Sequence, residues 1–222
     1  MTGKVAGKGR TQAQAGRKSP PAANEPFAGE GYHHGDLREA LIAATEDILA
    51  KEGVEFFTLR EVARRAGVSP AAPSHHFGNA AGLLVAVGLR GYAELTRMLK
   101  EAGEGAGTPI ERLHAQGAAY VRFALKHPGR FELMFSNKRR LIGDDRLKGA
   151  GRAAYEEMER TLGEVVPAKD VRVAAIAAWS TIHGFAKLAI EGKFDSAGKG
   201  SEKVIKGVLE PMLEYFWRGR GL

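Results

Sequence analysis

The chain has 222 residues, enough for one large domain or two small ones that each bury an apolar core. It contains no cysteine, which excludes disulfides, thiolate zinc sites and cysteine nucleophiles and fits a protein of the reducing cytoplasm. The formal net charge of +7 favours a polyanionic partner. No continuous apolar run reaches the roughly 18 residues of a membrane span, so we expect a cytoplasmic protein with no membrane partner.

Residues 1–30 are expected to form a disordered basic tail. Five lysines and arginines precede the first acidic residue, Glu25, and the rest is rich in Gly, Ala, Gln and Pro. Such a segment buries too little apolar surface to offset the entropy lost on ordering. The tail is either a solvated leader without a role or an arm that holds the protein on DNA without sequence preference.

A first amphipathic helix is predicted from Asp36 to Glu52. Its apolar residues recur at helical spacing, namely Leu37, Leu41, Ala44 and Ile48. Asp36 and Glu39 have the spacing of a capping box, and Gly53 is suited to end the helix.

Two short helices follow. Thr58 and Glu61 again have the spacing of a capping box, and the helix that they open ends at Gly67. Ser69 is a good N-cap, and Pro70 suits the first position of the next helix. Two short helices joined by a tight glycine turn predict a helix-turn-helix, which we place with its supporting helix at residues 31–79. Basic residues in the first of them, Arg60, Arg64 and Arg65, favour DNA binding over an ordinary helical corner.

Two parts of the sequence resemble a known family. The stretch from Tyr32 to about Leu95, with its T-L-R-E-V-A-R-R-A-G-V-S core, resembles the N-terminal domain of the tetracycline-repressor (TetR) family. His127–Phe135 and the A-W-S-T-I-H-G-F stretch at Ala178–Phe185 resemble the effector domain of its WHG subgroup. The resemblance implies an all-α fold, with a three-helix helix-turn-helix domain followed by a helical domain for effector binding and dimerisation. It also implies that residues 80–102 are a linker helix and that residues 103–222 form the second domain.

The second helix of a helix-turn-helix places its first residues against the bases. Here these residues are Pro70, Ala71 and Ala72, which offer only apolar contacts such as those with thymine methyl groups. The resemblance implies that Arg60 reaches a base and that other residues meet phosphates. The residues expected at DNA are Thr58, Arg60, Ser69, Pro70, Ala71, Ala72, Ser74, His75 and His76.

Three features depart from the usual pattern of this surface. The family usually has Tyr at the position of Ser74 and Lys at the position of Ala80, so two customary phosphate contacts are missing. Pro73 removes a helical hydrogen bond to the carbonyl of Ser69, so we expect a distorted start of the recognition helix.

The C-terminal half is predicted to be helical throughout. Thr108 caps a helix with Pro109 at its first position, which ends near Lys126 before a turn at residues 127–129. Residues 173–186 carry no formally charged side chain apart from His183, so we expect a helix that is buried all round. In a last helix, Pro211 is expected to introduce a kink.

The helix at residues 173–186 has a face of large side chains and a face of small ones. The small face permits close approach of another helix, and the resemblance implies that this helix and the last one form the interface of a homodimer. The expected interface residues are Val173, Ala177, Ser180, Gly184, Leu188, Ile205, Leu209, Met212 and Phe216.

The large face suits either a core or a pocket for a small-molecule effector of unknown identity. His183 is either a satisfied core residue or the polar group that orients the effector. In the second interpretation, the lining residues are Phe123, Phe131, Met134, Phe135, Tyr155, Trp179 and His183.

We find no sequence motif of an enzyme or a cofactor site, so we expect neither catalysis nor a cofactor. The histidine pairs at 33–34 and 75–76 lack the spacing of helical metal ligands, so no metal is expected. The favoured function is a sequence-specific transcriptional regulator, which binds a double-stranded DNA operator with palindromic symmetry and is released by an effector. The alternative is a basic module that binds nucleic acid without sequence preference.

Overall fold

The computed structural model describes residues 34–136, 144–194 and 200–218, and these residues are helical, with no β-strand among them. The predicted all-α fold is confirmed. The basic tail at residues 1–30 lies outside the described residues.

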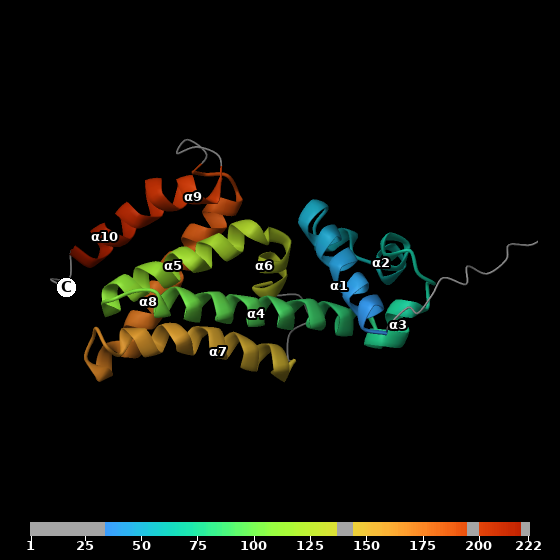
Figure 1. Ribbon diagram of the computed structural model, residues 1–222, viewed down its shortest axis with the longest axis horizontal. Helices are drawn as coiled ribbons and strands as arrows, with labels where there is room; N and C mark the ends of the chain where they lie inside the picture. Colours follow the sequence, from blue (N-terminus) through green and yellow to red (C-terminus); the bar gives the residue numbers. More distant parts are fainter. Residues whose placement is uncertain (1–33, 137–143, 195–199, 219–222) are drawn as a thin grey trace, which may run out of the picture. The chain divides into compact units, whose positions relative to one another are not determined.

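The helices follow one another along the chain with short connections (Figure 1). Their bounds are α1 His34–Lys51, α2 Leu59–Ala66, α3 Ala72–Phe77, α4 Ala80–Glu104, α5 Pro109–Lys126, α6 Pro128–Met134, α7 Asp145–Leu162, α8 Val171–Ile190, α9 Ser201–Val204 and α10 Glu210–Arg218. Shorter turns of helix lie at Val54–Phe56, Ala168–Asp170 and Ile205–Leu209.

The ends of α1 and α2 test the predicted caps. The Thr58 hydroxyl accepts a hydrogen bond from the Glu61 backbone N–H at 3.1 Å, as predicted. Gly67 ends α2 in the left-handed conformation at φ 67°, which glycine adopts without strain. Asp36 is not an N-cap, because α1 already begins at His34.

The start of α3 differs from the prediction. The helix begins at Ala72, and Ala71 rather than Ser69 takes the N-cap position without a side-chain hydrogen bond. The Ser69 carbonyl accepts from the Ala72 N–H at 3.0 Å, three residues on. Pro73 has no N–H to make the usual bond four residues on, so the proline shortens the recognition helix.

Two apolar cores lie along α4. The N-terminal core joins α1, α2 and the first half of α4, with Leu41, Ile48, Phe57, Val62, Leu83 and Val87 among its residues. The C-terminal core joins the second half of α4 to α5, α6, α8 and the last helices, with Leu95, Phe123, Phe131, Phe185, Ile205 and Leu209 among its residues. Figure 1 shows α4 extending from α1 and α3 to α5 and α7. One continuous helix therefore connects both cores.

Caps fix the limits of α4 and α5. The Asn79 side chain accepts from the Gly82 N–H at 3.0 Å at the start of α4. Thr108 caps α5 as predicted, and it forms a complete capping box with Glu111. Before Pro211 the chain takes a wider π-helical turn over Ile205–Leu209, which accommodates the missing proline N–H.

Candidate functional site

The residues expected at DNA lie on one surface of α2 and α3, which we call the reading surface. Ala72 and His76 are half-buried, and the other seven expected residues are exposed. Thr58, Arg60 and Pro70 line the same shallow hollow. The buried Pro73 anchors α3 behind this surface. The reading surface therefore presents the exposed Arg60 beside a mainly apolar and hydroxyl-bearing helix start.

Two of the basic residues that favour DNA binding, Arg64 and Arg65, have partners within the chain. Arg65 is 18% exposed and forms ion pairs with Asp47 at 2.8 Å, with Glu52 and with Glu61 at 2.8 Å. Arg64 pairs with Glu61 at 2.6 Å. Hydrogen bonds from the two guanidinium groups hold the pKa of Glu61 at about 2, well below its usual range. Arg65 therefore links α2 to α1 through its ion pairs.

Arg60 differs from these two residues. It is exposed, and it forms no ion pair with any residue in the described ranges. Its guanidinium is thus available for the two acceptors on a guanine edge, which an arginine binds in bidentate fashion.

This difference predicts how two substitutions affect DNA binding. Arg60→Ala should cost about 1–3 kcal/mol on the operator and relax the preference at one base position. His75→Ala should weaken binding to all sequences alike, because a phosphate contact carries no sequence information. Binding to operator and random duplexes, measured by fluorescence anisotropy with Arg97→Ala as control, separates the two effects. Equal losses on both duplexes for Arg60→Ala would contradict the assignment.

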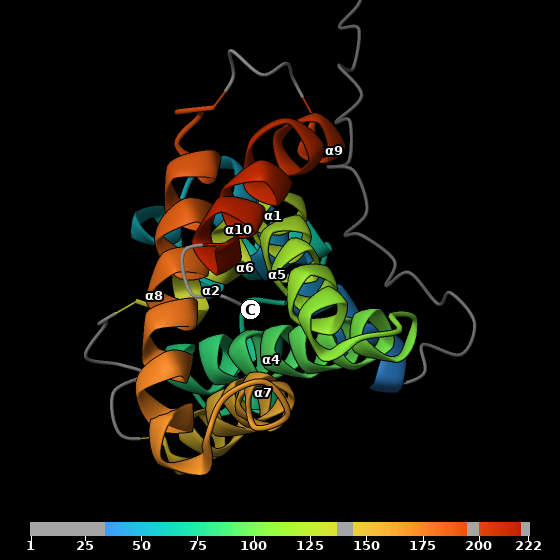
Figure 2. The same cartoon turned by 90° about the vertical axis from the view of Figure 1, so that its left-hand side faces the viewer.

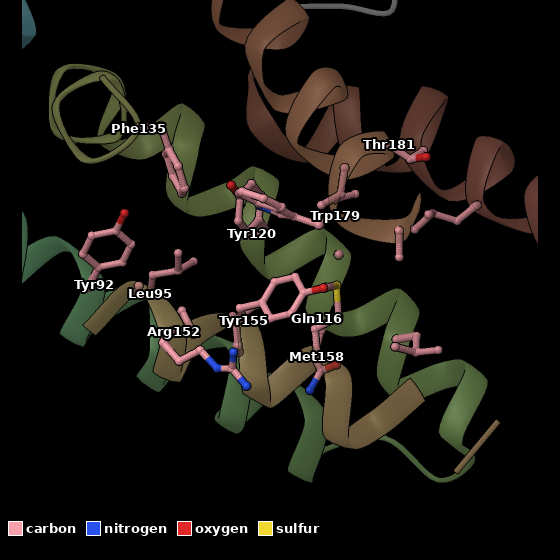
Figure 3. Close-up of a pocket in the computed structure, with 18 of the residues that line it drawn as sticks. Tyr92, Leu95, Gln116, Tyr120, Phe135, Arg152, Tyr155, Met158, Trp179 and Thr181 are labelled. Carbon is pink, nitrogen blue, oxygen red and sulfur yellow. The ribbon is translucent and has the colours of Figure 1, made fainter. Parts of the chain in front are cut away.

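A cavity of about 450 Å³ lies in the C-terminal half of the chain. Residues from α4, α5, α7, α8 and α10 line it. Figure 3 shows aromatic side chains around it, and these are Tyr92, Tyr120, Phe135, Tyr155 and Trp179. Its size falls in the range of small-molecule sites, and its wall is mostly apolar with a few polar groups, as is typical of them.

The expected effector residues divide into two sets. Phe135, Tyr155 and Trp179 line the cavity. Phe123 and Phe131 are fully buried in the core beside it, and Met134 and His183 also lie outside its lining. The sequence predicts these four in the lining because helical periodicity identifies a buried face. It does not show whether that face is filled by neighbouring side chains or open to a ligand.

His183 has a partner within the chain. Its Nδ1 lies 2.8 Å from the hydroxyl of Tyr120, and its ring stacks on Phe131 at 5.2 Å between centroids. Burial lowers the pKa of His183 and raises that of Tyr120, so both groups are neutral and the tyrosine hydroxyl can donate to the ring nitrogen. His183 thus orients Tyr120, which does line the cavity.

Several lining residues were missed by the sequence interpretation, among them Tyr92, Gln116 and Tyr120. One signal could have indicated Gln116. It lies in the apolar stripe of α5 between Leu113 and Tyr120, at helical spacing, where a polar residue is out of place.

Helix α6 contacts both halves of the described chain. Leu133 belongs to the N-terminal core, Phe131 belongs to the C-terminal core, and Phe135 at the end of α6 lines the cavity. A Cβ on Gly129 would lie 2.3 Å from the carbonyl group of Leu49 in α1, so only glycine fits this approach.

A buried arginine reinforces this junction. Arg130 in α6 is 6% exposed and pairs with Glu46 of α1 at 2.7 Å and with Glu94 of α4. His127 also lies 3.1 Å from Glu94. Helix α6 therefore connects the cavity wall at Phe135 to α1 by direct contacts, in addition to the connection through α4.

Helix α8 is buried on one side only, contrary to expectation. Ile182 and Ala186 on the predicted large face are buried, whereas Val173 is 71% and Leu188 is 44% exposed. Ser180 and Gly184 are exposed between them, and Ala177 is half-buried. Figure 2 shows α8 at the edge of the helices, with α4 and α7 on its inner side.

The segment Ala168–Ile190 is long and apolar enough to cross a membrane by length and composition alone, and 28% of its most apolar window is buried. The sequence did not predict such a segment, because no continuous apolar run is long enough. The buried part of α8 packs on α5 and α7, so this helix forms part of the core of the domain.

The expected interface residues in the last helices occupy different places. Ile205 and Leu209 are fully buried in the C-terminal core and are not accessible to a second chain. Phe216 lines the cavity, and Met212 is half-buried. Tyr215 is 82% exposed. The sequence did not predict it as an interface residue, because it lies off the apolar stripe on the inward side of α10.

An exposed helix-turn-helix joined to a ligand-sized cavity defines a DNA-binding regulatory protein. A family model described as bacterial regulatory proteins of the tetR family matches residues 41–87. A second model, described as the tetracyclin repressor-like C-terminal domain, matches residues 113–210. Together they match well over half of the chain. The chain belongs to the TetR family of transcriptional regulators, and it is a DNA-binding regulator and not an enzyme.

The chain is also similar to a curated relative and to solved structures. A protein of unknown function from Rhodococcus sp. RHA1 is 37% identical, with a TM-score of 0.72 over 86% of this chain and 98% of that one. An uncharacterized HTH-type transcriptional regulator of Mycobacterium tuberculosis is 26% identical over 80% of this chain and 84% of that protein. The regulator FadR from Bacillus subtilis, in complex with stearoyl-CoA, has a TM-score of 0.63 at 15% identity, over 79% of this chain and 97% of that one, and shares the fold.

Proposed function

We propose that the protein is a cytoplasmic repressor that binds a palindromic operator as a homodimer and is released when a small molecule enters the cavity. The observation that carries this proposal is the position of α6. Phe135 lines the cavity, while Leu133 and Arg130 contact the helix-turn-helix half. A ligand that displaces Phe135 can thereby change the orientation of the reading surface.

The exposed side of α8 supports the homodimer. Val173, Ile176 and Leu188 form exposed apolar surface along one helix, and such surface favours a partner. Two reading surfaces in a dimer must reach successive major grooves about 34–36 Å apart. A small rotation of each protomer spoils both contacts at once, so release needs only a modest change.

The cavity supports an apolar effector, because its buried wall is mainly aliphatic and aromatic. FadR of Bacillus subtilis, which shares the fold, is seen with stearoyl-CoA. The likeness of Ala178–Phe185 to the WHG subgroup belongs to the same proposal, since Ala178, Trp179 and Thr181 line the cavity. We propose residues 80–102 as the linker between the DNA-binding and effector domains.

The proposal predicts that the release of DNA by the effector depends on Trp179. A reporter promoter with an operator selected from random duplexes should be repressed by the wild type and by Trp179→Ala. Library compounds that induce the wild-type reporter should fail with Trp179→Ala, since a wall of the cavity is lost. The same compounds should change tryptophan fluorescence in vitro.

Trp217→Phe provides the control, since the chain has only two tryptophans and this variant leaves Trp179 as the reporter. Normal induction of the Trp179→Ala strain by every inducer would place the effector elsewhere.

A further inference from the structure

The cavity contains a buried side chain without a partner. Gln116 on α5 is 4% exposed and lines the cavity (Figure 3). Neither Nε2 nor Oε1 of its amide has a hydrogen-bond partner within the described ranges. A buried amide left in this state is destabilising, because it has lost its hydrogen bonds to water without gaining others. Both polar atoms of the side chain are therefore available to form hydrogen bonds with a ligand in the cavity.

Three other polar groups of the wall already have hydrogen-bond partners within the chain. Tyr120 is the other buried polar residue of the lining, and it is bonded to His183. The Tyr92 hydroxyl donates to the Met134 carbonyl at 3.0 Å. The Thr181 hydroxyl donates to the backbone of its own helix at 2.8 Å. Gln116 is thus the buried polar group of the described wall that remains open to a ligand.

The charges of the lining favour a neutral ligand. Its two cationic side chains are exposed and paired, Lys148 with Asp145 at 3.0 Å and Arg152 with Glu156 at 2.7 Å. A carboxylate beside Gln116 would lie in an apolar wall without a dedicated cation, and it would face Oε1, which can only accept. A group that both donates and accepts would satisfy the two ends of the amide.

We propose that Gln116 determines effector specificity, and that the effector is a neutral, largely apolar molecule with a group that both donates and accepts a hydrogen bond, such as a primary amide or a hydroxyl. This inference rests on the proposed function of the cavity. It adds the chemical class of the ligand and the residue that selects it.

Three probes of nearly equal shape test the proposal. Decanamide both donates and accepts, 2-undecanone replaces its NH₂ by a methyl group and only accepts, and decanoate is an anionic acceptor. Binding is measured at neutral pH by the fluorescence of Trp179 in full-length Trp217→Phe protein. We expect decanamide to bind about fivefold more tightly than 2-undecanone, because one further hydrogen bond is formed. Decanoate should bind most weakly.

Gln116→Leu in the same background keeps a similar side-chain size and removes both polar atoms. It should reverse the order of the neutral probes, because the amide N–H would be buried unpaired. Thr181→Val is the matched control, since its hydroxyl already bonds within α8, and it should keep the wild-type order.

Equal binding of decanamide and 2-undecanone to the Trp217→Phe protein would overturn the proposal and leave the ligand-binding role of the cavity intact. Persistence of the amide preference in Gln116→Leu would do the same. If none of the three probes changes the fluorescence, both this proposal and the proposed effector site are overturned.

Discussion

Gly184→Leu is expected to convert the protein from a dimer to a monomer. A Cβ at Gly184 meets no atom within 4 Å, so a larger side chain fits the isolated protomer. The same side chain would project from the exposed face of α8, between Ser180 and Leu188. If a second copy covers this face, the added leucine keeps the two helices apart. Loss of the second half-site contact should lower operator affinity by about 10²–10⁴-fold.

Sedimentation or light scattering gives the mass, and a thermal melt shows whether the protomer stays folded. Gly149→Leu on α7 is the matched control, because it is also exposed with no atom within 4 Å of its Cβ. A dimer of unchanged affinity for Gly184→Leu would place the interface elsewhere.

Arg130→Met is expected to cause a large loss of stability. The guanidinium is 6% exposed, and its removal leaves Glu46 and Glu94 partly buried without their main cation. Breaking a buried pair in this way typically costs about 3–5 kcal/mol, and the 21% exposure of the two glutamates favours the lower end. Urea unfolding followed by circular dichroism measures the change.

Arg152→Met is the control for this experiment. Arg152 pairs with Glu156 at 2.7 Å, but the side chains are 66% and 55% exposed, so solvent screens the pair. This variant should unfold like the wild type. Equal urea midpoints for Arg130→Met and the wild type would show that the ion pairs between α6, α1 and α4 do not hold the two halves together.

The helix-turn-helix was predictable because its signals are local. Thr58 caps the helix that it precedes, and Gly67 adopts the left-handed conformation at which α2 ends. Thr108 and Pro109 fixed the start of α5 in the same way. For α3 the sequence predicts the distortion at Pro73, but it does not predict that the N-cap moves from Ser69 to Ala71.

The site depends on contacts between distant segments, which local patterns do not contain. Arg65 is one of the basic residues that favour DNA binding in the sequence, but its guanidinium is bound to Asp47, 18 residues earlier. Phe123 and Phe131 share the period of lining residues, yet they fill the core. On α8 the sequence separates a face of large side chains from a face of small ones, but periodicity could not show which parts of the helix the rest of the chain covers.

A competition experiment tests most directly whether the protein is a sequence-specific regulator. The protein is bound to a labelled duplex carrying the operator recovered by selection, and unlabelled random duplex is added. Specific binding is typically 10³–10⁷-fold tighter than non-specific binding, so the complex should survive about a hundredfold excess of competitor. Displacement in simple proportion to added base pairs would contradict this account, and it would favour a basic module that coats nucleic acid without reading its sequence.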